Sequence, residues 1–204
     1  MNITIVGASS GTGAELAREA LVRGHAVTAI SRSGNVPEGV TAVTGDATDP
    51  AVARRAIDGA DAVFVTVGGS KGAQNPRTAV TRSVIAGMQE PGVRRLLVQT
   101  SLGAGGSARQ LPWPQSVLAP RILAGPLADH DAQEDLVRAS GLDWTIVRPA
   151  GLTNGTATGA WRALRSTDPG RVKGRISRAD VAGYLLHCLD YPATVGAEIG
   201  LSKD

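Results

Sequence analysis

The sequence predicts an α/β fold, with a doubly wound, mostly parallel sheet of six to seven strands. Two observations predict it: short β-branched runs alternate with segments of helical periodicity, and a glycine-rich turn joins the first strand to the first helix. Strands that alternate with helices pair in parallel through right-handed crossovers. Because 204 residues, 42% of them hydrophobic, suit one core, we predict a single domain over residues 1–204.

The first section of the chain opens with a β-branched strand over residues 2–6. A helix is expected to begin near Thr12, because apolar residues then recur on one face, and to end at Gly24, because glycine favours a helix C-terminus. Further strands are predicted over residues 26–30 and 40–43.

Two helices of the middle section are each predicted from a cap residue followed by proline. Asp49 stands before Pro50, and Asn75 stands in the same way before Pro76. Such pairs favour a helix start, because the side-chain oxygen accepts a hydrogen bond from a free amide and proline is tolerated in the first turn. A strand over residues 62–67 separates the two helices.

The last section continues the alternation. Strands are predicted over residues 93–100 and 143–147, on either side of a helix over residues 127–140. A serine followed three residues later by aspartate resembles a capping pair and starts a last helix over residues 177–189. A short final strand is expected over residues 197–201.

Two stretches, residues 103–126 and 150–176, are too long to be plain connections and are rich in glycine or proline. Loops of this length in a compact domain are usually functional. We predict that both cover the substrate side, the second as a small C-terminal substrate-side region, and that Trp113 and Trp161 stack on a flat substrate. The alternative is that each tryptophan packs within its own loop.

A phosphate-binding turn is predicted between the first strand and the first helix, which is the context that a glycine fingerprint requires. Glycine at positions 7 and 11 lets the backbone approach a pyrophosphate, which then faces free amides and the positive end of the helix dipole. Glycine at position 13 lets the helix pack closely on the strand. The expected dinucleotide ligands are Gly7, Ser9, Ser10, Gly11, Thr12 and Gly13.

The end of the second strand favours NADP(H) over NAD(H). An NAD-preferring site has an acidic residue there that accepts hydrogen bonds from the ribose, whereas this chain has Ser31, Arg32 and Ser33. A guanidinium pairs with a 2′-phosphate through two parallel hydrogen bonds. The alternative for Arg32 is a surface side chain. Asp46, after the third strand, is placed either to reach the adenine edge or to cap the following turn.

The composition argues against several other classes of protein. The net charge of +3 comes from scattered arginines, which do not form a nucleic-acid footprint. No apolar run approaches the ~18 residues of a membrane span, and the N-terminus lacks a secretion-signal pattern. Cys188 lies among leucines and is expected to be buried. We therefore expect a cytoplasmic protein that binds small molecules, with no nucleic-acid or membrane partner and no metal site.

Motifs along nearly the whole chain resemble one family. They are Gly7-Ala8-Ser9 to Gly13, Ser31-Arg32, Gly45-Asp46-Ala47, Gly59-Ala60-Asp61-Ala62-Val63, Gly92-Val93, Thr100-Ser101, Ser140-Gly141-Leu142, Arg148-Pro149 and Ser177 to Ala182. Together they are similar to the atypical branch of the short-chain dehydrogenase/reductases, which includes biliverdin IXβ reductase/flavin reductase and NmrA-like proteins. The resemblance implies a Rossmann-like fold and an NADP(H) cofactor. The further cofactor contacts expected are Ala47, Val67, Gly68, Gly69, Thr100, Pro149, Ala150, Gly151 and Leu152.

The chain departs from typical superfamily members in its proton donor. Those members use a Tyr-x-x-x-Lys pair, whereas Tyr184 and Tyr191 have no lysine four residues later, so the usual ketone/alcohol mechanism is not expected. The resemblance places Ser101 beside the nicotinamide as a catalytic residue, with a backbone cap as the alternative. It places His130 where atypical relatives often carry lysine. The ordinary pKa of histidine, ~6.5, makes this ring a candidate acid, with a solvated surface histidine as the alternative.

The leading hypothesis is an NADPH-dependent reductase that transfers hydride to a flat conjugated acceptor, such as a flavin, a quinone or a polyketide-like aromatic. Such an acceptor delocalises the incoming charge and needs little acid catalysis. One alternative is a non-catalytic NADP(H)-binding redox sensor of the NmrA-like type. Another is a cofactor-assisted isomerase or dehydratase with Ser101 and His130 as acid and base. We expect a monomer, with a homodimer as the alternative.

Overall fold

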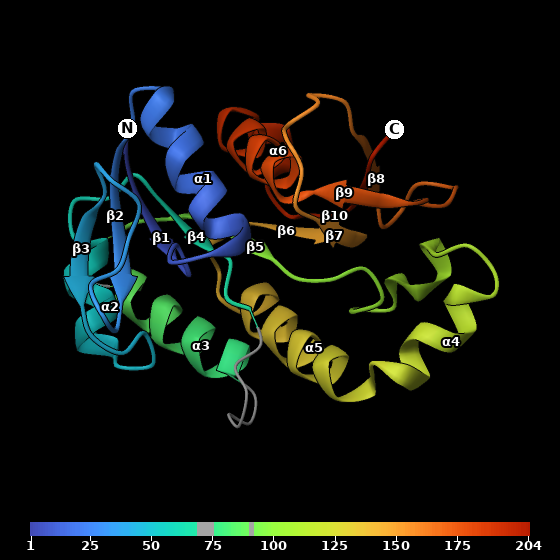
Figure 1. Ribbon diagram of the computed structural model, residues 1–204. Helices are drawn as coiled ribbons and strands as arrows, with labels where there is room; N and C mark the ends of the chain where they lie inside the picture. Colours follow the sequence, from blue (N-terminus) through green and yellow to red (C-terminus); the bar gives the residue numbers. More distant parts are fainter. Residues whose placement is uncertain (69–75, 90–91) are drawn as a thin grey trace.

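The computed structural model describes residues 1–68, 76–89 and 92–204, without the side chains of residues 119–121. Within these residues, a central sheet of eight strands carries helices on both faces (Figure 1). Neighbouring strands are parallel except for β8, which is antiparallel to β10. In spatial order the strands are β3 (Thr41–Thr44), β2 (Ala26–Ser31), β1 (Asn2–Val6), β4 (Ala62–Val65), β5 (Arg95–Gln99), β6 (Asp143–Pro149), β10 (Ala197–Ser202) and β8 (Arg162–Arg165).

Two groups of helices cover the sheet. On one face, α1 (Gly11–Val22) and α6 (Arg178–Asp190) lie side by side (Figure 1). On the other face are α2 (Pro50–Ile57), α3 (Pro76–Gln89) and α5 (Ala124–Arg138). This is the doubly wound arrangement that the alternation of strands and helices predicted.

The core is divided by the sheet into two apolar layers. Successive side chains of a strand point to opposite faces. Ile3 and Ile5 of β1 therefore pack in the layer beneath α1 and α6. Val63 and Val65 of β4 pack in the layer beneath α2, α3 and α5.

The order of the strands reverses at β1, with β2 and β3 on one side and β4, β5 and β6 on the other. In open sheets of this kind, ligands bind beyond the carboxyl ends of the strands at the point of reversal. Because α1 begins only a few residues after β1, its first turn lies at this edge. The topology therefore predicts the site between the ends of β1 and β4.

Two of the predicted helix caps are present. Asp49 Oδ1 accepts a hydrogen bond from the amide of Ala51 at 2.9 Å, and Ser177 Oγ accepts one from the amide of Asp180 at 2.9 Å. Asn75, the third predicted cap, lies outside the described residues. The predicted α/β fold with a mostly parallel sheet is confirmed.

The predicted loop over residues 103–126 contains helices. They are the 3-10 helix η1 (Ser107–Gln110), α4 (Gln115–Ile122) and the first turn of α5. Pro126 lies in that first turn, where the missing N–H has no helical partner to lose. High proline content therefore did not indicate an irregular segment here.

The second predicted loop, residues 150–176, contains β7 (Gly151–Thr153), β8 and the start of β9 (Arg175–Ser177). β7 pairs with β9 in a separate two-stranded parallel sheet. β8 extends the central sheet beyond β10, which is why that sheet has eight strands rather than six to seven. These strands are short and pair with distant segments, so no local alternation of apolar residues predicts them. A short 3-10 helix, η2 (Pro192–Thr194), precedes β10.

Cys188 is fully buried on α6, as predicted, and burial raises the pKa of its thiol to about 11. The thiol is therefore protonated at neutral pH, and a protonated thiol is a poor nucleophile. None of the helices in the described ranges has the length and apolar character needed to cross a bilayer.

Candidate functional site

A cleft of about 630 Å³ opens at the carboxyl ends of β1, β2, β4 and β5. Its lining comes from the turn before α1, the strand ends, the first turns of α3 and two residues of the C-terminal half. The lining residues are Val6, Gly7, Ser9, Ser10, Gly11, Thr12, Ile30, Arg32, Gly45, Asp46, Ala47, Thr48, Thr66, Val67, Gly68, Pro76, Ala79, Val80, Gln99, Leu152 and Arg178. Across the described part of the chain, no group of three or more His, Cys, Asp or Glu side chains is placed to hold a metal ion.

The turn between β1 and α1 is built around three glycines. Gly7 has φ of 101° and Gly11 has φ of 60°, values that residues with a side chain rarely adopt. A Cβ on Gly13 would strike the carbonyl oxygen of Gly7 and would lie 2.5 Å from Thr66 Oγ1. The turn therefore depends on glycine and presents bare backbone to the cleft.

Among the described residues, no side chain accepts a hydrogen bond from the first amides of α1. The N-cap residue, Ser10, makes no capping hydrogen bond, and the first turn contains no acidic residue. In contrast, Asp49 caps α2 and Ser177 caps α6. Uncapped N–H groups at a helix N-terminus that faces a cleft bind phosphate. This start of α1 fits the pyrophosphate of a dinucleotide.

Arg32 and Asp46 line the cleft just beyond the ends of the neighbouring strands β2 and β3. Asp46 Oδ1 accepts hydrogen bonds from the amide and the hydroxyl of Thr48, both at 2.9 Å. These bonds, with a smaller contribution from the charge of Arg32, hold the pKa of the Asp46 carboxyl below its ordinary value. Asp46 therefore caps the turn and also presents a carboxylate to the cleft, and its contact with the adenine edge stays a prediction.

The predicted cofactor ligands divide into two groups. Those that line the cleft are Gly7, Ser9, Ser10, Gly11, Thr12, Arg32, Asp46, Ala47, Val67, Gly68 and Leu152. Those outside its lining are Gly13, Ser31, Ser33, Thr100, Pro149, Ala150 and Gly151. Gly69 lies outside the described residues. Ser31 is buried because its hydroxyl donates to the backbone carbonyl of Asn35 at 3.1 Å.

The segment at the end of β6 contributes Leu152 alone to the described lining of the cleft. The Pro149 carbonyl accepts a hydrogen bond from the Leu102 amide at 3.1 Å, and the Ala150 amide donates to Leu201 at 2.8 Å. Gly151 starts β7 and pairs with β9. Pro149, Ala150 and Gly151, which were expected to contact the cofactor, thus make backbone hydrogen bonds within the protein and are outside the described lining.

Thr100 belongs to a buried ion-pair network rather than to the cleft lining. Its hydroxyl donates to Glu134 Oε1 at 2.8 Å. Arg148 Nε and Nη2 bind the same carboxylate at 2.8 and 2.6 Å, and neither charged side chain is exposed. Glu198 accepts from Arg148 and from Arg138, each at 2.7 Å. The network therefore ties the ends of β5 and β6 to α5 and β10.

His130 does not occupy the position that the sequence predicted for a catalytic acid. Only 7% of it is exposed, its Nδ1 lies 3.0 Å from Gln133 Oε1, and it is not part of the cleft lining. The adjacent Asp129 binds Arg77 and Thr78, so this face of α5 packs against α3. Burial, followed by the positive charge of Arg77, lowers the pKa of His130 and keeps the ring neutral at physiological pH.

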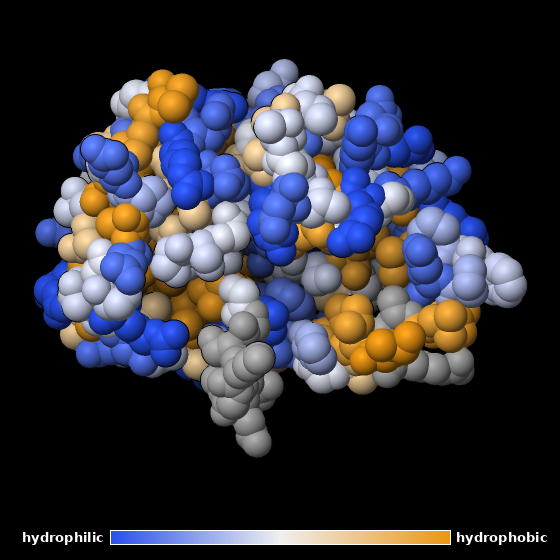
Figure 2. Space-filling model, in the orientation of Figure 1, coloured by the Kyte–Doolittle hydropathy of each residue, from blue (hydrophilic) through white to orange (hydrophobic). Residues whose placement is uncertain are grey.

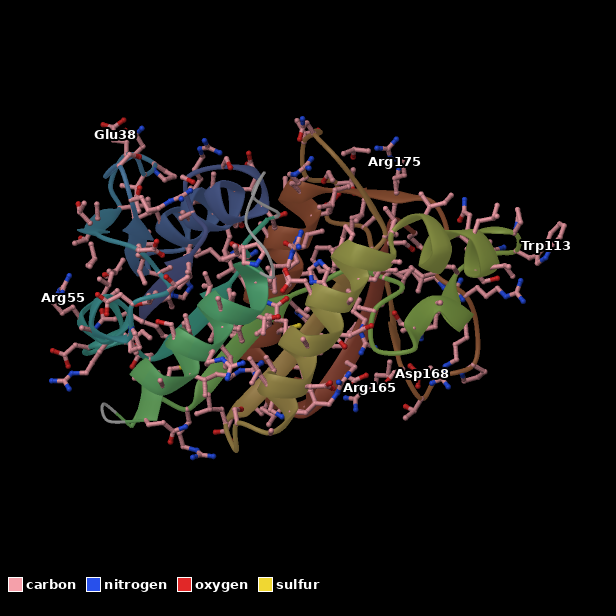
Figure 3. The ribbon with its side chains drawn as sticks, turned by 90° about the horizontal axis from the view of Figure 1, so that it is seen from below. Glu38, Arg55, Trp113, Arg165, Asp168 and Arg175 are labelled. Atoms are coloured by element: carbon pink, nitrogen blue, oxygen red, sulfur yellow. The ribbon has the colours of Figure 1, made fainter. Side chains whose placement is uncertain are left out.

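The two tryptophans do not flank the cleft. Trp113 is 74% exposed and points outward at the edge of the molecule (Figure 3). Trp161 packs edge-to-face on Tyr184, with ring centroids 5.5 Å apart, and lines a separate groove beside α1 and α6. Trp161 therefore packs on α6 rather than within its own loop, because Tyr184 offers it an aromatic surface.

Ser101 follows β5 and is outside the described lining of the cleft, whereas Gln99, two residues earlier, lines it. It is partly exposed, and its hydroxyl lies 3.4 Å from the carbonyl oxygen of Leu102, which is a weak contact. Gln99 Oε1 is buried and has no hydrogen-bond partner among the described residues. Two polar groups with unused hydrogen-bonding capacity therefore stand at the end of β5.

Several lining residues were missed by the sequence analysis. Pro76, Ala79 and Val80 of α3 follow the exit of β4, so the rule that ligands bind at strand exits could have identified them. Arg178 is different, because it starts the last helix and nothing in its local sequence places it beside Gly11.

Comparison with known proteins agrees with this geometry. Residues 7–192 match a family described as NAD(P)H-binding. The uncharacterized protein YwnB of Bacillus subtilis is 29% identical in an alignment that covers 94% of this chain and 93% of YwnB. YhfK of the same species, described as an uncharacterized sugar epimerase, is 28% identical over 153 residues, 72% of this chain and 65% of YhfK.

A solved structure described as ChuY, an anaerobillin reductase from Escherichia coli O157:H7, is 28% identical with a TM-score of 0.83. The alignment covers 100% of this chain and 97% of ChuY. The chain therefore belongs to the NAD(P)H-binding family and shares the Rossmann-type fold of short-chain dehydrogenase/reductase-like oxidoreductases.

Proposed function

We propose that the protein is an NADPH-dependent reductase that transfers hydride to a flat conjugated acceptor. The observation that carries this proposal is the composition of the cleft: its lining combines a glycine turn, uncapped helix amides and Arg32, and the described lining holds no Tyr–Lys or His-based proton donor. A site of this kind binds and positions a dinucleotide but offers little acid catalysis. Bound NADPH would supply the hydride.

The residues of the cleft divide the work of binding. The turn from Gly7 to Gly11 and the first amides of α1 would hold the pyrophosphate. Arg32 would pair with the 2′-phosphate. Val67 and Leu152 provide apolar surface. Ser101 follows β5 just outside the described lining, and it would orient the acceptor or donate a proton to it.

The proposed acceptor class is supported by the missing proton donor in the described lining. A conjugated ring system delocalises the arriving charge, so it needs no strong acid in the site. Exposed apolar side chains also gather over α4 (Figure 2), outside the described lining of the cleft, and they are Val117, Leu118, Ile122 and the adjoining Leu123. The similarity to ChuY, which is described as a reductase, supports the same reaction class.

The test is NADPH oxidation, followed by the absorbance of the reduced nicotinamide, with a panel of flavins, quinones, polyketide-like aromatics and anaerobillin. We expect turnover with at least one member of the panel. Tight NADPH binding without turnover on any acceptor would instead support the non-catalytic redox sensor. The isomerase or dehydratase alternative requires Ser101 and His130 as acid and base, and the burial of His130 outside the cleft lining does not favour it.

Arg32→Gln is expected to weaken NADPH binding by about 10- to 100-fold and to leave NADH binding nearly unchanged, because only NADPH carries the 2′-phosphate. Isothermal titration calorimetry measures both affinities. Arg55→Gln is the matched control, since Arg55 is an exposed arginine of α2 outside the cleft lining (Figure 3). Equal weakening of the two nucleotides would assign Arg32 a different role.

Ser101→Ala is expected to lower kcat by at least about 10-fold while changing the affinity for NADPH little, because the hydroxyl would act on the acceptor during transfer. Steady-state kinetics with the best acceptor of the panel, together with NADPH titration, separates the two effects. An unchanged kcat would remove Ser101 from the reaction and leave it as a backbone cap.

A further inference from the structure

We propose that Arg178 is a second anion-binding group of the cleft, which binds the pyrophosphate of the dinucleotide beside the glycine turn. The inference rests on the proposed dinucleotide binding and adds a ligand that the first part of the chain does not contain. Arg178 is the first residue of α6, yet it lines the same cleft as Gly7 to Thr12.

The side chain of Arg178 lies close to the glycine turn. Its Nε lies 3.6 Å and its Cδ 3.8 Å from where a Cβ on Gly11 would stand. Gly11 is the first residue of α1, so the guanidinium stands beside the uncapped amides. A phosphate bound by those amides would therefore meet Arg178.

The backbone of Arg178 is firmly held. Ser177 caps α6, and its hydroxyl also donates to Asp180 Oδ2 at 2.7 Å. Asp180 Oδ1 accepts from the amides of Thr158 and Gly159 at 2.7 and 2.9 Å. α6 in turn packs along α1 (Figure 1). The start of α6 is thus fixed relative to the glycine turn. A fixed position suits Arg178 as a residue that binds a ligand at that turn.

A protein contact orients the Arg178 guanidinium but does not use all of its hydrogen-bond donors. Arg178 Nη1 donates to Asn154 Oδ1 at 2.6 Å, in the segment that follows β7. A guanidinium carries several N–H donors, and within the described residues no other acceptor and no carboxylate pairs with this one. The remaining donors are available to a bound anion.

The charges along the cleft complement a dinucleotide phosphate. The described lining contains two cations, Arg32 and Arg178, and one carboxylate, Asp46. The charge of Arg32 acts on the Asp46 carboxylate and lowers its pKa. Arg32 follows the end of β2, whereas Arg178 lies beside Gly11. Two separated cations match the two separated anionic groups of NADP: the 2′-phosphate at Arg32 and the pyrophosphate at Arg178.

The experiment compares three probes by calorimetry: NADP⁺, NAD⁺ and adenosine 2′-monophosphate, which has no pyrophosphate. We expect Arg178→Gln to weaken NADP⁺ and NAD⁺ by the same factor, about 10- to 100-fold, and to leave adenosine 2′-monophosphate unchanged. Arg32→Gln should show the opposite pattern, weakening NADP⁺ and adenosine 2′-monophosphate but not NAD⁺. Arg171→Gln is the matched control, since it makes the same change in an exposed arginine outside the cleft lining.

Arg178→Lys tests the same contact without loss of charge and is expected to lie between the wild type and Arg178→Gln. Thermal melting of each variant shows whether α6 remains folded. Unchanged dinucleotide affinity in folded Arg178→Gln, or weakening confined to NADP⁺, would overturn this inference alone. If the wild type binds neither dinucleotide, the proposed function itself fails.

Discussion

Gly13→Ala is expected to destabilise the protein by about 3 kcal/mol and to remove measurable NADPH binding. The added Cβ would strike the Gly7 carbonyl oxygen and approach Thr66 Oγ1 to 2.5 Å. Neither neighbour can move without reshaping the turn: Gly7 is part of it, and the Thr66 hydroxyl donates to the Val6 carbonyl. Thermal melting should show a decrease of about 6–12 °C in Tm.

Gly125→Ala is the matched control for this prediction. Gly125 is exposed in the first turn of α5, and a Cβ there meets no atom within 4 Å. The same substitution should stabilise the protein by up to about 1 kcal/mol, because alanine is a better helix former than glycine. A Gly13→Ala variant with wild-type Tm and affinity would show that α1 and β1 do not pack as closely as described.

Glu134→Ala is expected to cost about 3–5 kcal/mol, because it leaves the buried Arg148 guanidinium without its bidentate partner. The Tm should fall by about 6–20 °C in a calorimetric scan. Arg148→Met combined with Glu134→Gln should recover part of the loss, since the pair then buries neither charge. Arg18→Gln, in the exposed Arg18–Glu15 pair, is the control and should change stability by no more than about 1 kcal/mol.

The same network predicts the pH dependence of stability. Burial opposes ionisation of Glu198, but the hydrogen bond from Arg138 and the charge of Arg148 outweigh it and hold its pKa below the ordinary value of 4.5. A depressed pKa stabilises the folded state above the unfolded pKa, and this contribution is lost as the pH falls through the folded pKa. Urea unfolding should therefore show stability falling below about pH 4.5, and Glu198→Gln should reduce that slope. An unchanged slope in Glu198→Gln would contradict this assignment.

The phosphate turn could be predicted because every contact that shapes it is local. Gly7, Gly11 and Gly13 lie between a strand and a helix that follow one another in the chain, and positive φ or close packing at these positions requires glycine. Arg32 could be placed for a similar reason, since the end of a strand in a parallel sheet determines the edge at which a residue lies. Gly7, Gly11 and Arg32 line the cleft, as expected, whereas Gly13 is outside its lining.

Contacts between distant elements could not be predicted. His130 follows a helical pattern that fits a solvated face, but the packing of α5 against α3 buries it. Thr100 ends a strand at the correct edge, yet its hydroxyl is bound by a carboxylate from α5. Trp161 lies in a segment of low regularity and is placed by an aromatic surface on α6. In each case, the environment depends on a partner far away in the sequence.

The amino-acid sequence by itself determined the alternation of strands and helices, the glycine turn and the cation after β2, because these depend on backbone preference and on neighbours within a few residues. Only the tertiary structure decided which side chains are buried and which share the cleft. Arg178 shows the reason: it reaches Gly11 because α6 packs along α1, and such packing results from the burial of apolar faces across the whole sheet.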